Sequence, residues 1–356
     1  MDGITFKGAL ELGRGTHLKL DIIDKKIIAI LGENARATHL FISKLVGLSK
    51  GSVRYRIERM RQLDLLRATT IIINPYKLGF SFYTVFLRLG NIDDKKELEI
   101  MQYLALHPYT VWTGICLNWD ISINLFAHDE HHLQEIIKEI EQQCAHYLKE
   151  IQIIPIISII SYRNIPAAFA EELGLKIEFS KKDLSFGSVI KREVAEKINE
   201  ITKLDNLDAI IIKNLGKDAN TSFSAIAKEG NTTIDTVKNR IERLIKEKVI
   251  LSFNPLFNIS YLGFQTYVIF IKLKPNAKVE LLENFLREVI QFTLKTYGIW
   301  DYTLWVALEN ELALFYLLRE LRKTFQDLIA SFDTITVIKD FKFNLVPSGL
   351  LKDVSN

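Results

Sequence analysis

An internal repeat constrains this chain more than any other feature of its sequence. When the chain is shifted by 184 residues against itself, Leu20–Leu89 aligns with Leu204–Leu273 without a gap, and 22 of 70 positions are identical. The longest identical run joins Arg56–Arg59 to Arg240–Arg243. A repeat of this length is typical of a duplicated unit rather than of a solenoid built from short repeats. The 356 residues therefore predict two copies of one two-domain protein.

Each copy begins with the pattern of a helix-turn-helix domain. In the first copy we expect helices at Leu20–Leu31, Thr38–Val46 and Ser49–Leu63, separated by short turns. Ser49 is a suitable N-cap for the third helix because its hydroxyl can accept a hydrogen bond from the first turn. An isoleucine-rich stretch, Leu65–Ile73, follows and is expected to form a small β-hairpin or wing.

The second part of each copy alternates strand and helix signals in the order β-α-β-β-α-β. The expected elements of the first copy are Ser81–Leu89, Lys95–Leu106, Val111–Cys116, Asp120–Phe126, Asp129–Leu148 and Ile151–Ile160. Those of the second copy are Thr266–Leu273, Ala277–Val289, Phe292–Thr296, Asp301–Leu308, Leu312–Ile329 and Thr334–Phe343. This order is that of a ferredoxin-like fold. The predicted class is α+β, with two winged helix-turn-helix domains alternating with two ferredoxin-like (βαββαβ) domains.

These elements divide the chain into seven expected segments. They are an N-terminal extension (1–17), a first winged helix-turn-helix (18–76), a first ferredoxin-like domain (77–160), a linker (161–201), a second winged helix-turn-helix (202–260), a second ferredoxin-like domain (261–346) and a C-terminal tail (347–356).

The third helix of the first copy is strongly basic, although the net charge of the whole chain is small. The formal net charge is only +3, but Ser49–Gln62 contains five basic residues and one acidic residue. At 100° per residue, Val53, Ile57 and Met60 share one side and are expected to pack against the other two helices. The opposite side is then free to enter a DNA groove, with basic side chains near phosphates. This pattern favours a double-stranded DNA reader.

The equivalent helix of the second copy is the weaker candidate. Thr233–Lys246 contains four basic and two acidic residues, with Val237, Ile241 and Leu244 on its apolar side. Asp235 lies near the start of this helix, where a carboxylate would repel a DNA phosphate. The second head therefore binds DNA less tightly or reads a different sequence.

The candidate DNA-contacting residues follow from these two faces. They are Ser49, Lys50, Ser52, Arg54, Tyr55, Arg56 and Arg59 in the first copy, and Thr233, Thr236, Lys238, Asn239, Arg240 and Arg243 in the second. The alternative is that both helices simply present solvated basic faces. Arg56 and Arg240 lie near the apolar side, so pairing with an acidic neighbour is as good an interpretation for them as phosphate contact.

Several motifs together resemble the Lrp/AsnC transcriptional regulators. They are Leu20-Asp21-x-x-Asp24-x-x-Ile27-x-x-x-Leu31, Val46-Gly47-Leu48-Ser49, Val53-x-x-Arg56-Ile57-x-x-Met60, Leu78-Gly79-Phe80, His107-Pro108, Asn118-Trp119-Asp120 and Gly298-Ile299-Trp300-Asp301-Tyr302. The chain is most similar to archaeal regulators that carry the unit in tandem. The resemblance implies a ligand-binding RAM-type second domain and a homodimer or higher homo-oligomer formed through it. The second copy departs from the pattern with Asn231-Thr232-Thr233 before its third helix and Val289-Ile290 in place of His-Pro.

The resemblance also implies an amino acid or other small effector at the RAM-type domains. Trp119 with Asp120, and Trp300 with Asp301, are the candidate effector residues, with each carboxylate holding an amino group. The alternative is structural, with each tryptophan packed at the sheet and each aspartate capping a turn.

The remaining signals point away from catalysis and metal binding. His128-Asp129-Glu130-His131-His132 opens an expected helix, where acidic residues favour the positive end of the dipole, so we expect no metal. We expect no cofactor and no enzyme activity. Siroheme decarboxylases share the tandem architecture, but their His-Asn-Tyr-x-Arg run after His-Pro is replaced here by Tyr109-Thr110-Val111-Trp112. That enzyme class, and an oligomeric scaffold with decayed DNA-binding heads, remain the alternatives.

The cellular location expected from the sequence is the cytoplasm, in association with the nucleoid. The two cysteines, Cys116 and Cys144, suit a reducing compartment and rule out a disulfide scaffold. No apolar signal-peptide core begins the chain, and its apolar stretches are too short or too polar to span a bilayer.

Overall fold

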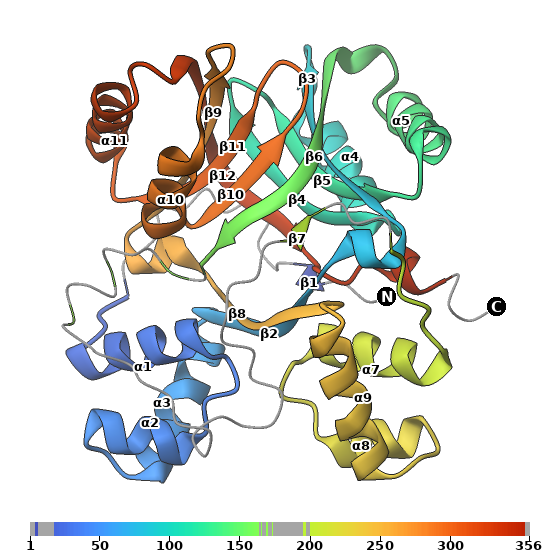
Figure 1. Ribbon diagram of the computed structural model, residues 1–356, viewed down its shortest axis with the longest axis vertical. Helices are drawn as coiled ribbons and strands as arrows, with labels where there is room; N and C mark the ends of the chain where they lie inside the picture. The colour runs from blue at the N-terminus through green and yellow to red at the C-terminus, as the bar shows by residue number, and fades with distance from the viewer. Residues whose placement is uncertain are drawn as a thin grey trace.

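The computed structural model describes residues 4–5, 18–163, 165, 169, 173, 195–196 and 200–352. Figure 1 shows an upper body of β-strands with helices on its outside and two three-helix heads beneath it. A two-stranded sheet lies between the heads and the upper body (Figure 1). The α+β class predicted from the sequence is confirmed. Among the described residues, no helix is both long enough and apolar enough to cross a membrane.

The two heads are built from the same three helices in the same order. Head 1 contains α1 (Ile22–Glu33), α2 (His39–Val46) and α3 (Lys50–Gln62), and head 2 contains α7 (Asn206–Lys217), α8 (Phe223–Glu229) and α9 (Ile234–Lys246). Each helix begins after a polar residue whose side chain accepts a hydrogen bond from the backbone N–H three positions later. These caps are Asp21, Thr38, Ser49, Asp205, Ser222 and Thr233. The predicted cap at Ser49 is confirmed.

The stretch expected to form a hairpin is instead one strand of a sheet shared by the two copies. β2 (Leu66–Ile73) pairs antiparallel with β8 (Ile250–Phe257) of the second copy. The hairpin prediction is wrong because the chain does not turn back after β2. Asn74 accepts a hydrogen bond from the Tyr76 N–H and starts the 3-10 helix η1 (Pro75–Leu78), which leads on to the upper body. Strand pairing across the copies therefore ties head 1 to head 2.

The upper body contains the two ferredoxin-like units. The first consists of β3 (Ser81–Leu89), α4 (Asp94–Leu106), β4 (Thr110–Leu117), β5 (Ile121–Ala127), α5 (Glu130–Cys144) and β6 (Leu148–Tyr162). The second consists of β9 (Gln265–Leu273), α10 (Glu280–Val289), β10 (Phe292–Thr296), β11 (Tyr302–Leu308), α11 (Glu311–Thr324) and β12 (Ile329–Phe343). The predicted βαββαβ order is confirmed in both copies.

The two units close into one eight-stranded barrel inside a single chain. The strand order is β12-β4-β5-β3-β6-β10-β11-β9, and β9 pairs with β12 again. Closure depends on β6 and β12, which have 15 residues each and pair with one unit along one half and with the other unit along the other half. Phe86 and Phe270, at equivalent positions of the two copies, meet edge to face inside with ring centroids 5.5 Å apart. The sheets of the two ferredoxin-like units therefore pair within the chain.

Several expected boundaries in the upper body differ from the structure, and two of them are the ends of the helices α5 and α11. α5 was expected to continue to Leu148, but it ends at Cys144 because Ala145 adopts a φ of 49°, which cannot continue a helix. The following 3-10 turn, η2 (Ala145–Tyr147), leads directly into β6. The sequence predicts a helix that ends at Ile329, but Ile329 is the first residue of β12 and is buried in the core of the second unit.

Candidate nucleic-acid interface

Helix α3 presents a polar face away from the core of head 1. Val53, Ile57 and Met60 are buried, as the helical periodicity predicted. The Ser49 hydroxyl accepts a hydrogen bond from the Ser52 N–H at 3.1 Å, which orders the first turn of the helix. Tyr55 on the outward side is 70% exposed, although it is a large aromatic residue. Tyrosine is enriched at interfaces, so an exposed Tyr55 between basic neighbours is compatible with a surface that contacts a partner.

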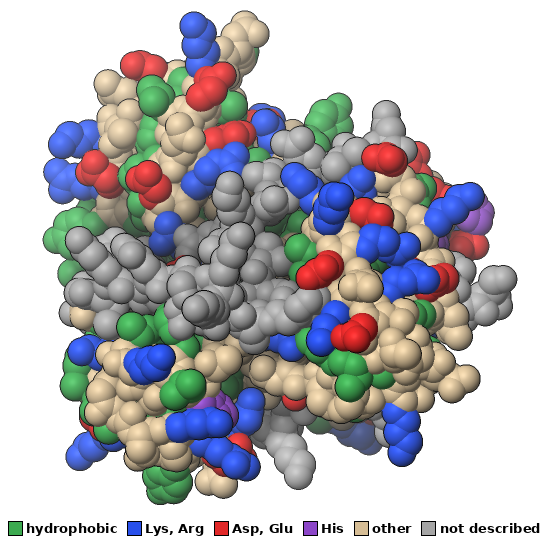
Figure 2. Space-filling view, turned by 60° about the horizontal axis from the view of Figure 1, so that its bottom comes forward, with side chains coloured by type: hydrophobic (Ala, Val, Ile, Leu, Met, Phe, Trp, Pro, Cys, Tyr) green, Lys and Arg blue, Asp and Glu red, His purple; other side chains and the backbone are tan. Residues whose placement is uncertain are grey.

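Positive charge gathers around the start of α2 and the outward side of α3. Partial burial lowers the pKa of His39, and the nearby charges of Arg61, Arg54 and Lys50 lower it further. These three cations therefore act on one place on head 1, as expected for a phosphate-binding surface. Figure 2 turns the lower end of the molecule, where the heads lie, toward the viewer and shows many Lys and Arg side chains there.

Arg56 points toward its own head rather than toward solvent. Its Nη1 lies 2.7 Å from Asp21 Oδ2 and 2.6 Å from Asp24 Oδ1. The hydrogen bonds that Arg56 donates to Asp24 and Asp21 raise its pKa, so the guanidinium stays charged. Arg59 approaches the same buried Asp24 at 3.8 Å. These contacts hold α3 against the N-terminus of α1, and they correspond to the acidic-neighbour interpretation of Arg56.

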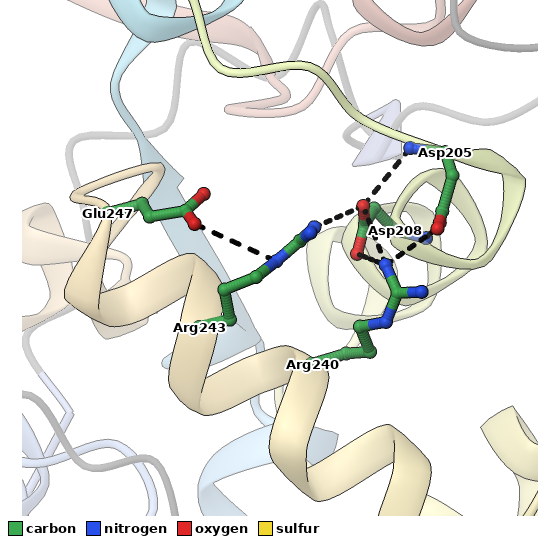
Figure 3. Close-up of polar contacts among 5 residues, drawn as sticks. All are labelled: Asp205, Asp208, Arg240, Arg243 and Glu247. Atoms are coloured by element: carbon green, nitrogen blue, oxygen red, sulfur yellow. Dashed lines mark hydrogen bonds and ion pairs between the residues drawn. The ribbon is translucent and has the colours of Figure 1, made fainter.

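Head 2 repeats this arrangement residue for residue. Arg240 Nη1 lies 2.6 Å from Asp205 Oδ2 and 3.3 Å from Asp208 Oδ1. Arg243 also donates to Asp208, whose side chain is fully buried, and its Nε lies 4.0 Å from Glu247 (Figure 3). The sequence reasoning did not identify Asp208 or Asp24 as partners. The signal was available, because both aspartates and both arginines are identical between the copies.

The outward face of α9 is less basic than that of α3. Lys238 Nζ lies 3.1 Å from Asp235 Oδ1 one turn earlier, so part of its charge is matched within the helix. Thr233 and Thr236 are hydrogen-bonded to each other at 2.8 Å at the start of the helix. Asn239 is exposed on the same side. Four of the six predicted residues of head 2 thus lie near the start of α9 with Asp235 among them, namely Thr233, Thr236, Lys238 and Asn239, whereas Arg240 and Arg243 contact Asp208.

Acid is expected to weaken the contact between Arg56 and the cap of α1. The Asp24 backbone N–H chiefly lowers the pKa of Asp21 below 3.8, and Arg56 lowers it further although partial burial opposes both effects. Because the folded pKa is the lower one, this contribution to stability is complete above the unfolded value and is lost as pH falls through the folded value. Urea unfolding of head 1 measured at falling pH should show this loss. Asp21→Asn should remove it, and an unchanged acid dependence in that variant would contradict the assignment.

The four candidate effector residues lie at strand ends and make structural contacts. Asp120 accepts a hydrogen bond from the Leu89 N–H at 2.6 Å, and Asp301 accepts one from the Leu273 N–H at 2.7 Å. Trp119 packs among apolar residues with the Arg88 guanidinium 4.7 Å from its ring centroid. Trp300 stacks on Phe270 with ring centroids 5.6 Å apart. These contacts correspond to the structural alternative, in which the tryptophans pack and the aspartates cap.

The histidine cluster at the start of α5 packs against aromatic rings. The Tyr109 and His132 rings are 4.4 Å apart, and the Phe80 and His128 rings are 3.9 Å apart. Asp129 caps the helix by accepting from the His132 N–H at 2.8 Å. In the part of the chain that the structure describes, no group of three or more His, Cys, Asp or Glu side chains is arranged to hold a metal ion.

Comparisons with known proteins agree with this geometry. The family model of the AsnC-type helix-turn-helix domain matches residues 20–61. The regulatory protein AsnC of Haemophilus influenzae is 29% identical over 123 residues, which are 33% of this chain and 79% of that protein. The HTH-type transcriptional regulator FL11 of Pyrococcus horikoshii is 36% identical over 95 residues, covering 27% of this chain and 62% of the relative.

The similarity in fold extends further along the chain than the similarity in sequence. The crystal structure of the siroheme decarboxylase NirDL matches with a TM-score of 0.58 and covers 94% of this chain and 98% of its own, at 10% sequence identity. At that identity the match concerns the fold alone.

The HTH-type transcriptional regulator LrpA of Pyrococcus abyssi is 38% identical over 94 residues, which are 24% of this chain and 67% of LrpA. This chain therefore belongs to the Lrp/AsnC family of transcriptional regulators.

Proposed function

We propose that the protein binds double-stranded DNA sequence-specifically and uses both heads of one chain to do so. The observation that carries this proposal is the pair of equivalent helices, α3 and α9, held below one barrel and joined through the β2–β8 sheet. Helix-turn-helix regulators usually obtain two linked heads by dimerisation, with half-sites one or more turns of DNA apart. Here covalent linkage supplies the second head.

Within each head, we divide the predicted contact residues into those that contact DNA and those that pair with buried aspartates of the head. Ser49, Lys50, Ser52, Arg54 and Tyr55 are the proposed DNA-contacting residues of head 1. In head 2 the corresponding residues are Thr233, Thr236, Lys238 and Asn239. The four arginines that meet Asp24 and Asp208 (Arg56, Arg59, Arg240 and Arg243) position the helices, since charged groups paired with buried carboxylates are costly to remove.

The remaining parts of this proposal concern regulation, assembly and location. A small effector, for which an amino acid is the family precedent, modulates DNA binding through the RAM-type barrel. Any homodimer or higher homo-oligomer uses an outer surface, because both sheets are already paired within the chain. We further propose a non-enzymatic protein of the cytoplasm, associated with the nucleoid.

Selection of bound duplexes from a random pool, followed by footprinting, tests the proposal. We expect one chain to protect two patches on one side of the duplex, about one or more helical turns apart. Binding should weaken steeply as salt is raised, because phosphate contacts release counterions. Absence of any duplex binding at low salt would contradict the proposal and favour the scaffold alternative. Copurification of a tetrapyrrole without duplex binding would favour the decarboxylase alternative.

A further inference from the structure

The barrel interior is packed along part of its length and hollow toward the β2–β8 sheet. Phe86, Trp119 and Phe270 belong to an apolar cluster that extends to Trp112 and Trp305. At the end facing the β2–β8 sheet lies a cavity of about 270 Å³, to which all eight barrel strands contribute lining residues. β2 and β8 contribute most of the other described lining residues. Mouths of small β-barrels are recurrent sites for small ligands.

The cavity combines aromatic walls with a few polar groups. Phe82, Phe126 and Phe292 contribute from three different strands. Trp112 and Trp305 meet edge to face with ring centroids 4.8 Å apart, and both line the cavity. The Trp305 indole Nε1 is buried and has no hydrogen-bond partner among the described residues. A buried donor without a partner costs free energy, which a ligand with an acceptor group would recover.

Asp340 is the second polar group of the site. Its Oδ1 accepts a hydrogen bond from the Trp112 indole at 2.9 Å, and its Oδ2 lies 3.9 Å from Arg67 Nη1. Burial raises the pKa of Asp340, against the opposing effect of Arg67, although 34% of its side-chain surface is accessible. Asp340 is one of the residues that line the cavity. Oδ2 is placed to accept a hydrogen bond from a ligand N–H.

Among the described residues that line the cavity, the formal charges cancel. Arg67 and Arg163 are the basic lining residues, and Glu33 and Asp340 are the acidic ones. An ionised ligand would have to leave water for a site with no excess of opposite charge, which is unfavourable. An uncharged ligand avoids this cost and gains from contact with the aromatic walls.

We propose that this cavity binds an uncharged aromatic molecule carrying an amide-type group, which donates to Asp340 and accepts from Trp305. The ligand would contact both the barrel and the β2–β8 sheet, so it would fix the sheet that joins the heads against the barrel. Neither Trp119 nor Trp300 is among the described residues that line this cavity. The proposed ligand can bind to this cavity without DNA, because every residue that would contact the ligand belongs to the protein itself.

Calorimetric titration of the full chain with 2-naphthamide tests the site without DNA. We expect saturable binding of one molecule per chain. The isosteric anion 2-naphthoate should bind about tenfold more weakly or not at all, because it offers no donor and would place a carboxylate against Asp340. No saturable binding of the amide would overturn the proposal, as would equal binding of the two compounds.

Conservative variants then test the two polar contacts. Trp305→Phe should weaken amide binding about five- to tenfold, the usual effect of one lost hydrogen bond. Trp300→Phe, which changes a tryptophan outside the cavity, is the matched control and should leave binding unchanged. Asp340→Asn should still bind 2-naphthamide. It should bind 2-naphthoate more tightly than the wild-type protein does, because the repulsion between the two carboxylates is removed. Equal effects of the two tryptophan variants, or no gain for the anion in Asp340→Asn, would overturn the assignment.

Hydrogen exchange of the free and amide-bound protein provides a further readout. Backbone amides of β2 and β8 should exchange more slowly when the compound is bound, because it contacts both the sheet and the barrel. Circular dichroism and thermal unfolding of each unliganded variant control for loss of fold. Protection confined to the far end of the barrel would place the compound elsewhere and contradict the proposal.

Discussion

Replacing Arg54 and Tyr55 together by alanine is expected to weaken duplex binding at least tenfold, and more than replacing Lys238 and Asn239 together. Arg54 belongs to the group of cations that lower the pKa of His39, and Tyr55 is 70% exposed beside it. Lys238, by contrast, already has Asp235 within 3.1 Å, so its removal takes away less net attraction for phosphate. Fluorescence anisotropy with a selected duplex measures both losses.

The salt dependence of the same measurement separates the roles of the two residues. Arg54→Ala alone should reduce the slope of log affinity against log salt by about one, because one phosphate contact is lost. Tyr55→Phe, a control for the hydroxyl group, should leave that slope unchanged. Equal losses in the two heads, or no loss in either, would contradict our ranking of head 1 as the stronger DNA-binding head.

The helices and strands could be predicted because their signals are local. The apolar spacing of α3 correctly indicated which side is buried, and β3 and β10 have the predicted bounds. In these segments the hydrophobic period and the capping residues indicate the same structure, so a single sequence is sufficient. The predicted end of a helix was wrong where an unusual backbone conformation stops the helix, as at Ala145, which has a positive φ.

Pairing between the copies could not be predicted because it depends on contacts between distant segments. The sequence of β2 indicates a strand but does not identify β8, more than 170 residues away, as its partner. The 15-residue lengths of β6 and β12, which allow the barrel to close, were underestimated, because their ends carry more polar residues than a buried strand does. The cavity was missed for the same reason, since its lining comes from every strand of the barrel.

The ambiguous position of Arg56 and Arg240 shows what a repeat adds to sequence reasoning. Helical periodicity placed both at the edge of the apolar face and allowed either phosphate contact or an ion pair. The structure places both against carboxylates that are themselves repeated, Asp24 and Asp208. Identity of a charged pair in both copies, across α1 and α3, is therefore a useful indication that the two residues contact each other.

Removing Arg240 and Arg243 together is expected to destabilise head 2 by about 2–3 kcal/mol. The double alanine variant leaves Asp208 fully buried with no arginine partner. The cost should lie below that of breaking a fully buried pair, because the two arginine side chains are 30% and 36% exposed and are partly screened by water. Hydrogen exchange of α7 and α9 amides measures the stability of head 2 separately from the barrel.

The matched control is Lys238→Ala with Lys246→Ala, which removes the same charge from the same helix. Those side chains do not contact Asp208, so the stability of head 2 should change by less than about 0.5 kcal/mol. Adding Asp208→Asn to the double arginine variant should recover part of the lost stability, because the uncompensated buried charge is then removed. Equal destabilisation by the lysine pair, or no recovery with Asp208→Asn, would mean that the two arginines do not act through Asp208. Any effect of removing Arg240 and Arg243 would then have to come from contacts that they make with DNA.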